Sequence, residues 1–182
     1  MKTCFIGHRN VFVNNIRERI EEAILVEMAN GCRTFTMGTH GDFDSLALAA
    51  CRHLRRTHKE IDIEVVITSL KTFAKSTNEY KDNPYHDVKT VMYVIKEAHF
   101  KQQITLSNRK MIDECDTLIC YVDENESRSG AKTAMRYAKK HGLKIVNLYR
   151  EEDHPFYGMT KEEIDKLWNS LCEKVFSKKE KK

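Results

Sequence analysis

The sequence predicts an α/β fold of the Rossmann-like kind, with a mostly parallel sheet and helices on both of its faces. Two observations carry this prediction. Short apolar runs alternate with amphipathic helical patterns along the chain, which is typical of parallel strands joined by helices. In addition, most of the seven glycines lie where one of these runs or patterns ends.

Five segments are expected to form strands because they are short, apolar or alternating, and bounded by glycine or polar residues. The third of them changes from alternation to continuous apolar residues, as a central strand with two covered faces would. The five are residues 2–6, 33–37, 61–67, 116–122 and 144–149. Two stretches stay open: residues 68–87 indicate a loop or irregular insertion, and residues 88–100 fit either a strand or a helix.

The expected helices have apolar residues at steps of three and four. They cover residues 14–30, a segment that follows Ser45, and residues 106–115, 130–140 and 160–176. Gly31 stands where a C-terminal capping glycine belongs, and Asp42 or Asp44 is the expected N-cap of the second helix. Residues 160–163 have the pattern of a capping box for the last helix.

Composition and length limit the class of protein. The chain has 182 residues, of which 41% are hydrophobic and 32% charged, with a formal net charge of +4. This length fits one domain, which we expect over residues 1–176, followed by a charged tail at residues 177–182. The charge suits an anionic small ligand, whereas no basic stripe with interleaved aromatic residues points to nucleic acid.

The cysteines and the apolar runs indicate the compartment. Six cysteines occur, but none forms a CxxC pair and their spacing matches no zinc ribbon. No apolar run approaches 18 residues, and the run at the N-terminus is too short for a signal peptide. We therefore expect a cytoplasmic protein with no membrane partner, no metal and no cofactor. The sequence leaves the oligomeric state open, a homo-oligomer included.

Three polar segments at predicted strand ends indicate a ligand site. They are residues 7–9, 38–45 and 127–133, and they are rich in Gly, Ser, Thr, His and Arg. In an open parallel sheet, ligands bind beyond the carboxyl ends of the strands, where the strand order reverses. We therefore expect these segments to form one site. Its expected ligand-binding residues are Gly7, His8, Arg9, Gly38, Thr39, His40, Gly41, Asp44, Ser129, Gly130 and Thr133.

The residue types in these segments suit an anionic group. Arg9 can form a two-pronged hydrogen bond to a phosphate or carboxylate, and backbone N–H groups at a helix start attract anions. Each feature also has a purely structural explanation. Arg9 could be an exposed arginine after an ordinary turn, and Asp42 or Asp44 could only cap a helix. His40 with Asp42 and Asp44 also has metal-ligating side chains, but three residues in one turn are a weak signal.

Two further groups have open alternatives. Asn108 and Arg109 are expected to open the helix before the strand at residue 116, where both would face the ligand cleft; alternatively, Arg109 pairs with Asp113. Within residues 68–87, three side chains could cover a base by stacking or belong to a solvent loop. These are Asn78, Tyr80 and Tyr85.

Four motifs resemble one branch of the SLOG superfamily, the YpsA-like branch with a Gly-His-Arg opening. Cys4 to Arg9 resembles that opening, and Gly38 to Ala47 resembles its glycine-rich turn followed by Phe-Asp and an alanine-rich helix. Asn108 to Asp116 resembles its RN-x-x-M-(V/I)-D-x-(S/C)-D segment, with Arg and Asn exchanged. Ser129 to Ala138 resembles its Gly-Gly-Thr helix start. The motif order is kept over residues 4–149.

The resemblance implies a Rossmann-like fold that binds nucleotides or molecules derived from them. The superfamily includes DNA-processing proteins that bind single-stranded DNA and LOG-type phosphoribohydrolases that cleave the N-glycosidic bond of a nucleoside monophosphate. LOG enzymes carry Pro-Gly-Gly-x-Gly-Thr followed by a catalytic glutamate. This chain departs from that pattern, because Ala134, Met135 and Arg136 stand where the glutamate would fall.

Three functions follow as hypotheses. The first is a sensor or binding module for a nucleotide or a nucleotide-derived small molecule. The second is an N-glycosidase, either a phosphoribohydrolase or a deoxyribosyltransferase, which needs a carboxylate near the anomeric carbon. Its candidate catalytic residues are Asp42, Asp44 and Asp123. The third is a single-stranded nucleic-acid binder, whose affinity would fall steeply with salt.

Overall fold

The computed structural model describes residues 1–68, 83–93 and 100–176. The chain divides into two compact units, residues 1–149 and residues 150–182, which are described separately. One domain over residues 1–176 therefore stays a prediction, and the tail at 177–182 lies outside the described residues. Within the described residues, no helix combines the length and the apolar composition that crossing a membrane would require.

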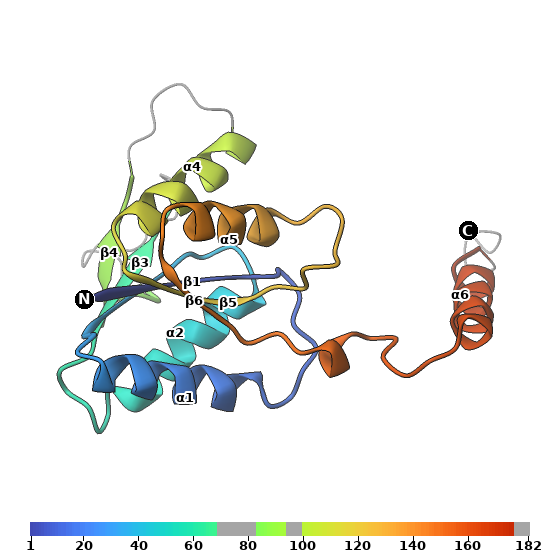
Figure 1. Ribbon diagram of the computed structural model, residues 1–182, viewed down its shortest axis with the longest axis horizontal. Coiled ribbons are helices and arrows are strands. Elements are labelled where there is room, and N and C mark those ends of the chain that lie inside the picture. The colour runs from blue at the N-terminus through green and yellow to red at the C-terminus, as the bar shows by residue number, and fades with distance from the viewer. Residues whose placement is uncertain (69–82, 94–99, 177–182) are drawn as a thin grey trace. The chain divides into compact units, whose positions relative to one another are not determined.

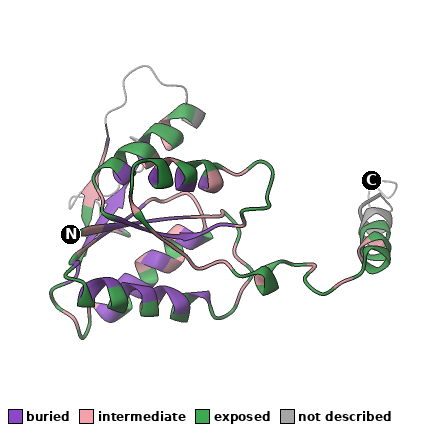
Figure 2. Ribbon diagram, in the orientation of Figure 1, coloured by how far each residue is buried: buried purple, intermediate pink, exposed green. Residues whose placement is uncertain are grey.

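The first unit is built on a six-stranded sheet in which every neighbouring pair of strands is parallel. The strand order is β4-β3-β2-β1-β5-β6. The strands are β1 (Lys2–Gly7), β2 (Thr34–Met37), β3 (Asp62–Val66), β4 (Lys89–Val91), β5 (Thr117–Tyr121) and β6 (Lys144–Asn147). Central strands β1 and β5 are almost wholly buried (Figure 2), which explains their continuous apolar residues.

Helices cover both faces of this sheet (Figure 1). Helices α1 (Ile16–Ala29) and α2 (Asp42–Leu54) lie on one face, and α4 (Phe100–Asp113) and α5 (Gly130–Lys140) lie on the other. Alternation along β1 divides the core accordingly, because Phe5 packs with α1 and α2 whereas Cys4 and Ile6 pack with α5. The predicted Rossmann-like class, with a parallel sheet and helices on both faces, is confirmed.

The order of the strands reverses beside β1. The chain moves outward from β1 through β2 and β3 to β4, and then returns to place β5 on the opposite side of β1. The loops that leave the carboxyl ends of β1 and β5 therefore separate toward opposite faces of the sheet. This is the topological switch point at which open α/β sheets bind ligands.

Several expected boundaries need correction. Helix α4 begins at Phe100, six residues before the expected start at Leu106, because no capping signal marks its polar first turns. The ambiguous stretch at 88–100 contains the short strand β4. Residues 94–99 of this stretch lie outside the described residues. Of the expected insertion at 68–87, residues 69–82 lie outside the described residues. Asn78 and Tyr80 are among these undescribed positions.

The predicted caps have different outcomes. Gly31 follows α1 with a φ of 91°, a left-handed conformation that glycine adopts at low cost, so the expected C-terminal cap is confirmed. The prediction that Asp42 or Asp44 caps α2 is wrong, since the N-cap is Gly41 and neither aspartate caps the helix.

The second unit contains a short 3₁₀ helix (Glu151–Asp153) and helix α6 (Lys161–Phe176). At the start of α6, the N–H of Thr160 donates to the Glu163 carboxylate and the N–H of Glu163 donates to the Thr160 hydroxyl. These two reciprocal hydrogen bonds confirm the predicted capping box.

Candidate functional site

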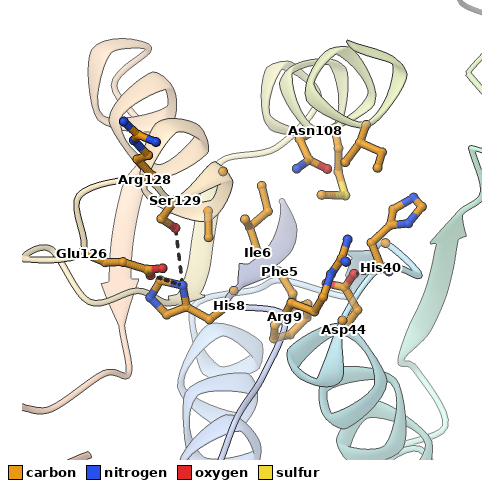
Figure 3. Close-up of a pocket in the computed structure, with 17 residues that line it drawn as sticks. Phe5, Ile6, His8, Arg9, His40, Asp44, Asn108, Glu126, Arg128 and Ser129 are labelled. Atoms are coloured by element: carbon orange, nitrogen blue, oxygen red, sulfur yellow. Dashed lines mark hydrogen bonds and ion pairs between the residues drawn. The ribbon is translucent and has the colours of Figure 1, made fainter. Parts of the chain in front are cut away.

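A pocket of about 290 Å³ lies at the switch point, beyond the carboxyl end of β1. Segments 5–9, 38–44 and 126–131 line it together with one face of α4. Figure 3 shows Arg9, His40 and Asp44 on one side, and His8, Glu126 and Ser129 on the other. The three polar segments expected from the sequence therefore meet in one place, as parallel strands that end at the same edge require.

Most of the expected ligand-binding residues line this pocket: Gly7, His8, Arg9, Gly38, His40, Gly41, Asp44, Asn108, Ser129 and Gly130. Thr39, Arg109 and Thr133 are not among the lining residues of the described chain. The Thr133 hydroxyl donates to the carbonyl of Ser129 within α5. The guanidinium of Arg109 lies 5.3 Å from the ring centroid of Tyr137, which is a cation–π contact.

Gly7 is required by a close contact between β1 and α2. A Cβ atom at this position would lie 2.4 Å from Cγ of Phe43, closer than two non-bonded carbon atoms can approach. Phe43 is fully buried and stacks on Tyr121 of β5 with a centroid separation of 6.0 Å. Gly7 therefore leaves room for the Phe43 ring to pack against the end of β1, a role that the sequence did not predict.

Gly41 allows the loops after β1 and β2 to pass each other. A Cβ atom at this position would lie 2.8 Å from the backbone Cα of Arg9, and that backbone is also tied by the Asp42 N–H, which donates to the Arg9 carbonyl at 2.7 Å. Any larger residue would push the two loops apart. Consequently, Gly41 sets the position of Arg9 relative to the start of α2.

His8 joins the end of β1 to the loop before α5. Its Nε2 accepts the backbone N–H of Asp123 at 2.7 Å, so this nitrogen carries no proton and the ring proton is on Nδ1. The Nδ1 atom lies 3.0 Å from Oε2 of Glu126 and 3.4 Å from Oγ of Ser129. His8 thus presents one N–H donor, on Nδ1, toward Glu126 and Ser129.

Arg9, His40 and Asp44 form the other side. The Asp44 carboxylate accepts the backbone N–H of His40 at 2.8 Å, and His40 Nε2 lies 2.6 Å from the Thr68 hydroxyl. Burial, and then the charge of Arg9, lower the pKa of His40. Among the described residues, no hydrogen bond or ion pair holds the Arg9 guanidinium, and Arg9 is exposed. It is therefore free to meet a ligand.

The N-terminus of α5 provides backbone donors. Ser129 is the N-cap, and its hydroxyl accepts the N–H of Lys132 at 3.2 Å. The N–H groups of Gly130 and Ala131 precede the first intrahelical hydrogen bond, and both residues line the pocket. Together with the positive end of the helix dipole, these groups favour an anion.

The three candidate catalytic carboxylates are placed differently. Asp44 lines the pocket, whereas Asp42 accepts the backbone N–H of Val11 at 3.2 Å. Asp123 accepts the N–H of Asn125 at 2.8 Å and the hydroxyl of Tyr149 at 3.2 Å, which fixes the loop after β5. Asp44 is therefore the one of the three that is in reach of a pocket ligand.

Ile104, Met111 and Glu126 line the pocket but were not expected from the sequence. Asn108 lies within α4, not at its start, and shares one helix face with Ile104 and Met111, which also line the pocket. The spacing of four and three residues around Asn108 was the signal that could have identified them. Glu126 and Arg128 also line the pocket and belong to the polar turn before α5.

The remaining expectations concern metals, cysteines and base stacking. The described residues contain no group of three His, Cys, Asp or Glu side chains that could hold a metal ion. Of the described cysteines, Cys4, Cys32, Cys51 and Cys120 are buried free thiols, as small core residues are. Tyr85 packs partly buried against the core on the α1 and α2 face.

The fold and the pocket define a Rossmann-like α/β protein with a cleft at its topological switch point. Comparison with known families gives the more particular assignment. The profile of the YspA SLOG family (YpsA) matches residues 4–152, which is more than half of the chain. The protein belongs to this family, as the four motifs indicated. A search of curated proteins finds no match to the chain.

The environment of Asp44 predicts a pH-dependent stability. Burial raises its pKa to about 6, while the N–H of His40 acts in the opposite direction. The folded protein then holds a proton on Asp44 more tightly than the unfolded chain does. The stability from this proton is complete below the unfolded pKa, which is about 4, and is lost as the pH rises through about 6.

An asparagine side chain cannot ionise, so Asp44→Asn should gain stability relative to wild type as the pH rises from about 4 to about 7.5. We expect the difference in unfolding free energy to change by about 1–3 kcal/mol in favour of the variant over this range. Urea denaturation of both proteins at the two pH values measures it. A difference that stays constant with pH would contradict the assignment of a buried, proton-holding carboxyl group.

Proposed function

We propose that this protein binds a nucleotide or a nucleotide-derived small molecule in the switch-point pocket, as a sensor or binding module. The observation that carries the proposal is the convergence on one pocket of the Arg9 guanidinium, which no described residue pairs with, and the first turn of α5. These two groups suit a phosphate or diphosphate. Membership in the SLOG family supports a small-molecule ligand.

The other side chains of the pocket suit the sugar and base. Asp44 retains acceptor capacity beyond its bond from His40, which suits a ribose hydroxyl. Asn108 adds an amide with two donors and an acceptor, and Ile104 and Met111 add apolar surface. The volume of about 290 Å³ lies near the lower end of the range for small-molecule sites, roughly 300–1,000 Å³.

Thermal-shift screening tests the proposal. The probes are AMP, ADP-ribose, NAD and cyclic nucleotides, each tested over a concentration series. At about 100 times its dissociation constant, a ligand of the folded state should add roughly 2.7 kcal/mol of stability and raise the melting temperature. Adenosine without phosphate is the matched control. If none of the probes raises the melting temperature, the proposal fails.

One observation favours an N-glycosidase as the second candidate. Asp44 lines the pocket and burial of its carboxyl group raises its pKa to about 6, so it can exchange a proton near neutral pH. A carboxylate near the anomeric carbon is what cleavage of the N-glycosidic bond needs. Chromatography of nucleoside monophosphates incubated with the protein should then show free base, and Asp44→Asn should abolish its release. A protein that binds these nucleotides and releases no base is a binding module.

A further inference from the structure

Glu126 places a negative charge at the side of the pocket that otherwise suits an anion. Its carboxylate lines the pocket with Ser129 and Gly130 of the α5 N-terminus (Figure 3). Its backbone is held at both ends, because its N–H donates to the Asp123 carbonyl at 3.3 Å and its carbonyl accepts from Lys132 Nζ at 3.0 Å. The side chain, by contrast, is 48% exposed.

We propose that Glu126 is an internal competitor for the anionic group of the ligand. The carboxylate takes the donor that a phosphate at the α5 N-terminus would use, and the ligand displaces it on binding. This inference rests on the proposed function, which it deepens by assigning the phosphate to the α5 side of the pocket.

The competition follows from which ring nitrogen of His8 carries the proton. Since Nε2 accepts the Asp123 N–H, His8 offers its single proton on Nδ1, and Glu126 lies 3.0 Å from that atom. A phosphate seated on α5 would need the same donor and would meet a like charge beside it. When the Glu126 side chain swings into solvent, both the His8 donor and the helix N-terminus become available.

The charges around the pocket agree with this proposal. Among the described residues, its lining contains two guanidinium groups, Arg9 and Arg128, and two carboxylates, Asp44 and Glu126. Asp44 is beside Arg9 across the pocket from α5 (Figure 3), so of these two carboxylates Glu126 is the one on the α5 side. The negative charge of Glu126 weakens the binding of free phosphate. A nucleotide can still bind, because its sugar and base make further contacts that offset the displacement of the Glu126 carboxylate.

Glu126→Gln tests this directly, because the amide oxygen can still accept from His8 Nδ1 while the charge is gone. The matched control is Glu124→Gln, which removes the same charge from the same loop but from a side chain that pairs with Lys139. Calorimetric titration with AMP should give a dissociation constant roughly threefold to tenfold lower for Glu126→Gln than for wild type. Glu124→Gln should stay within roughly twofold of wild type.

Adenosine and melting temperatures complete the experiment. The gain should appear with AMP and not with adenosine, since only the phosphate competes with the carboxylate, and the unliganded variants should melt close to wild type. If wild type binds AMP and Glu126→Gln binds it equally or more weakly, the inference is overturned and the proposed function stands. If neither protein binds AMP, the inference is also overturned, and the screen with the other nucleotides decides the proposed function separately.

Discussion

Replacing Gly7 with alanine is expected to lower the free energy of unfolding by about 2–3 kcal/mol. The added methyl group would lie 2.4 Å from Phe43 Cγ, so either β1 or the aromatic ring must move. Phe43 has no space to retreat, because Phe5 and Tyr121 pack on it at centroid distances of 6.5 and 6.0 Å. Urea denaturation followed by circular dichroism measures the loss.

Gly130→Ala is the matched control for this substitution. Outside its chain neighbours and its own helix backbone, a Cβ at Gly130 meets no atom of the described residues within 4 Å. The same chemical change at the pocket should therefore shift stability by less than about 0.5 kcal/mol. A double-mutant cycle with Phe43→Ala assigns the cause. If Phe43 makes Gly7 necessary, alanine at position 7 should cost far less once the ring is gone. Equal costs in both backgrounds would contradict the steric account.

Arg9→Ala is expected to weaken ligand binding roughly tenfold to a hundredfold without unfolding the protein. A charge-assisted hydrogen bond is typically worth about 1.5–3 kcal/mol, and Arg9 lines the switch-point pocket. The fold should tolerate the change, because the structural contacts of this residue are made by its backbone. A calorimetric titration with the best nucleotide of the screen and a melting curve measure the two effects.

Arg109→Ala provides the comparison for Arg9. It removes an equal charge from a side chain that lies on Tyr137 of α5, so it should leave the affinity within about twofold. Normal binding by Arg9→Ala would show that Arg9 is a surface residue only. An early melting transition in that variant would instead assign it a structural role in the loop between β1 and α1.

The sequence was sufficient to predict the layers of the fold and the polar strand ends. Apolar runs alternate with helical patterns because each strand and helix must bury a face, and that requirement is local. The strand order could not be predicted from the sequence, because the order depends on which faces of distant segments pack together. The convergence of residues 7–9 with 127–131 follows from β5 lying beside β1, a pairing between segments more than a hundred residues apart.

The incorrect prediction of the α2 cap has a physical cause of the same kind. Asp42 and Asp44 have the composition of helix caps, but their carboxylates accept N–H groups of Val11 and His40, which precede the helix. Propensity scales describe the cap position and not these competing donors. For Arg109, the sequence left open whether it faces the cleft or pairs with Asp113. Adjacent helix residues point about 100° apart, so Arg109 points away from the direction of Asn108 and lies on Tyr137.

Nuclear magnetic resonance of the backbone amides during titration with the best nucleotide tests the central claim most directly. The largest shifts should occur at Gly7 to Arg9, at Gly38 to Asp44 and at Ser129 to Ala131, which meet in the switch-point pocket. Amides at the opposite ends of the strands, such as those of Thr34 and Asp62, should remain unchanged. Shifts concentrated at those opposite ends, with the three loops unaffected, would contradict the assignment of the ligand site.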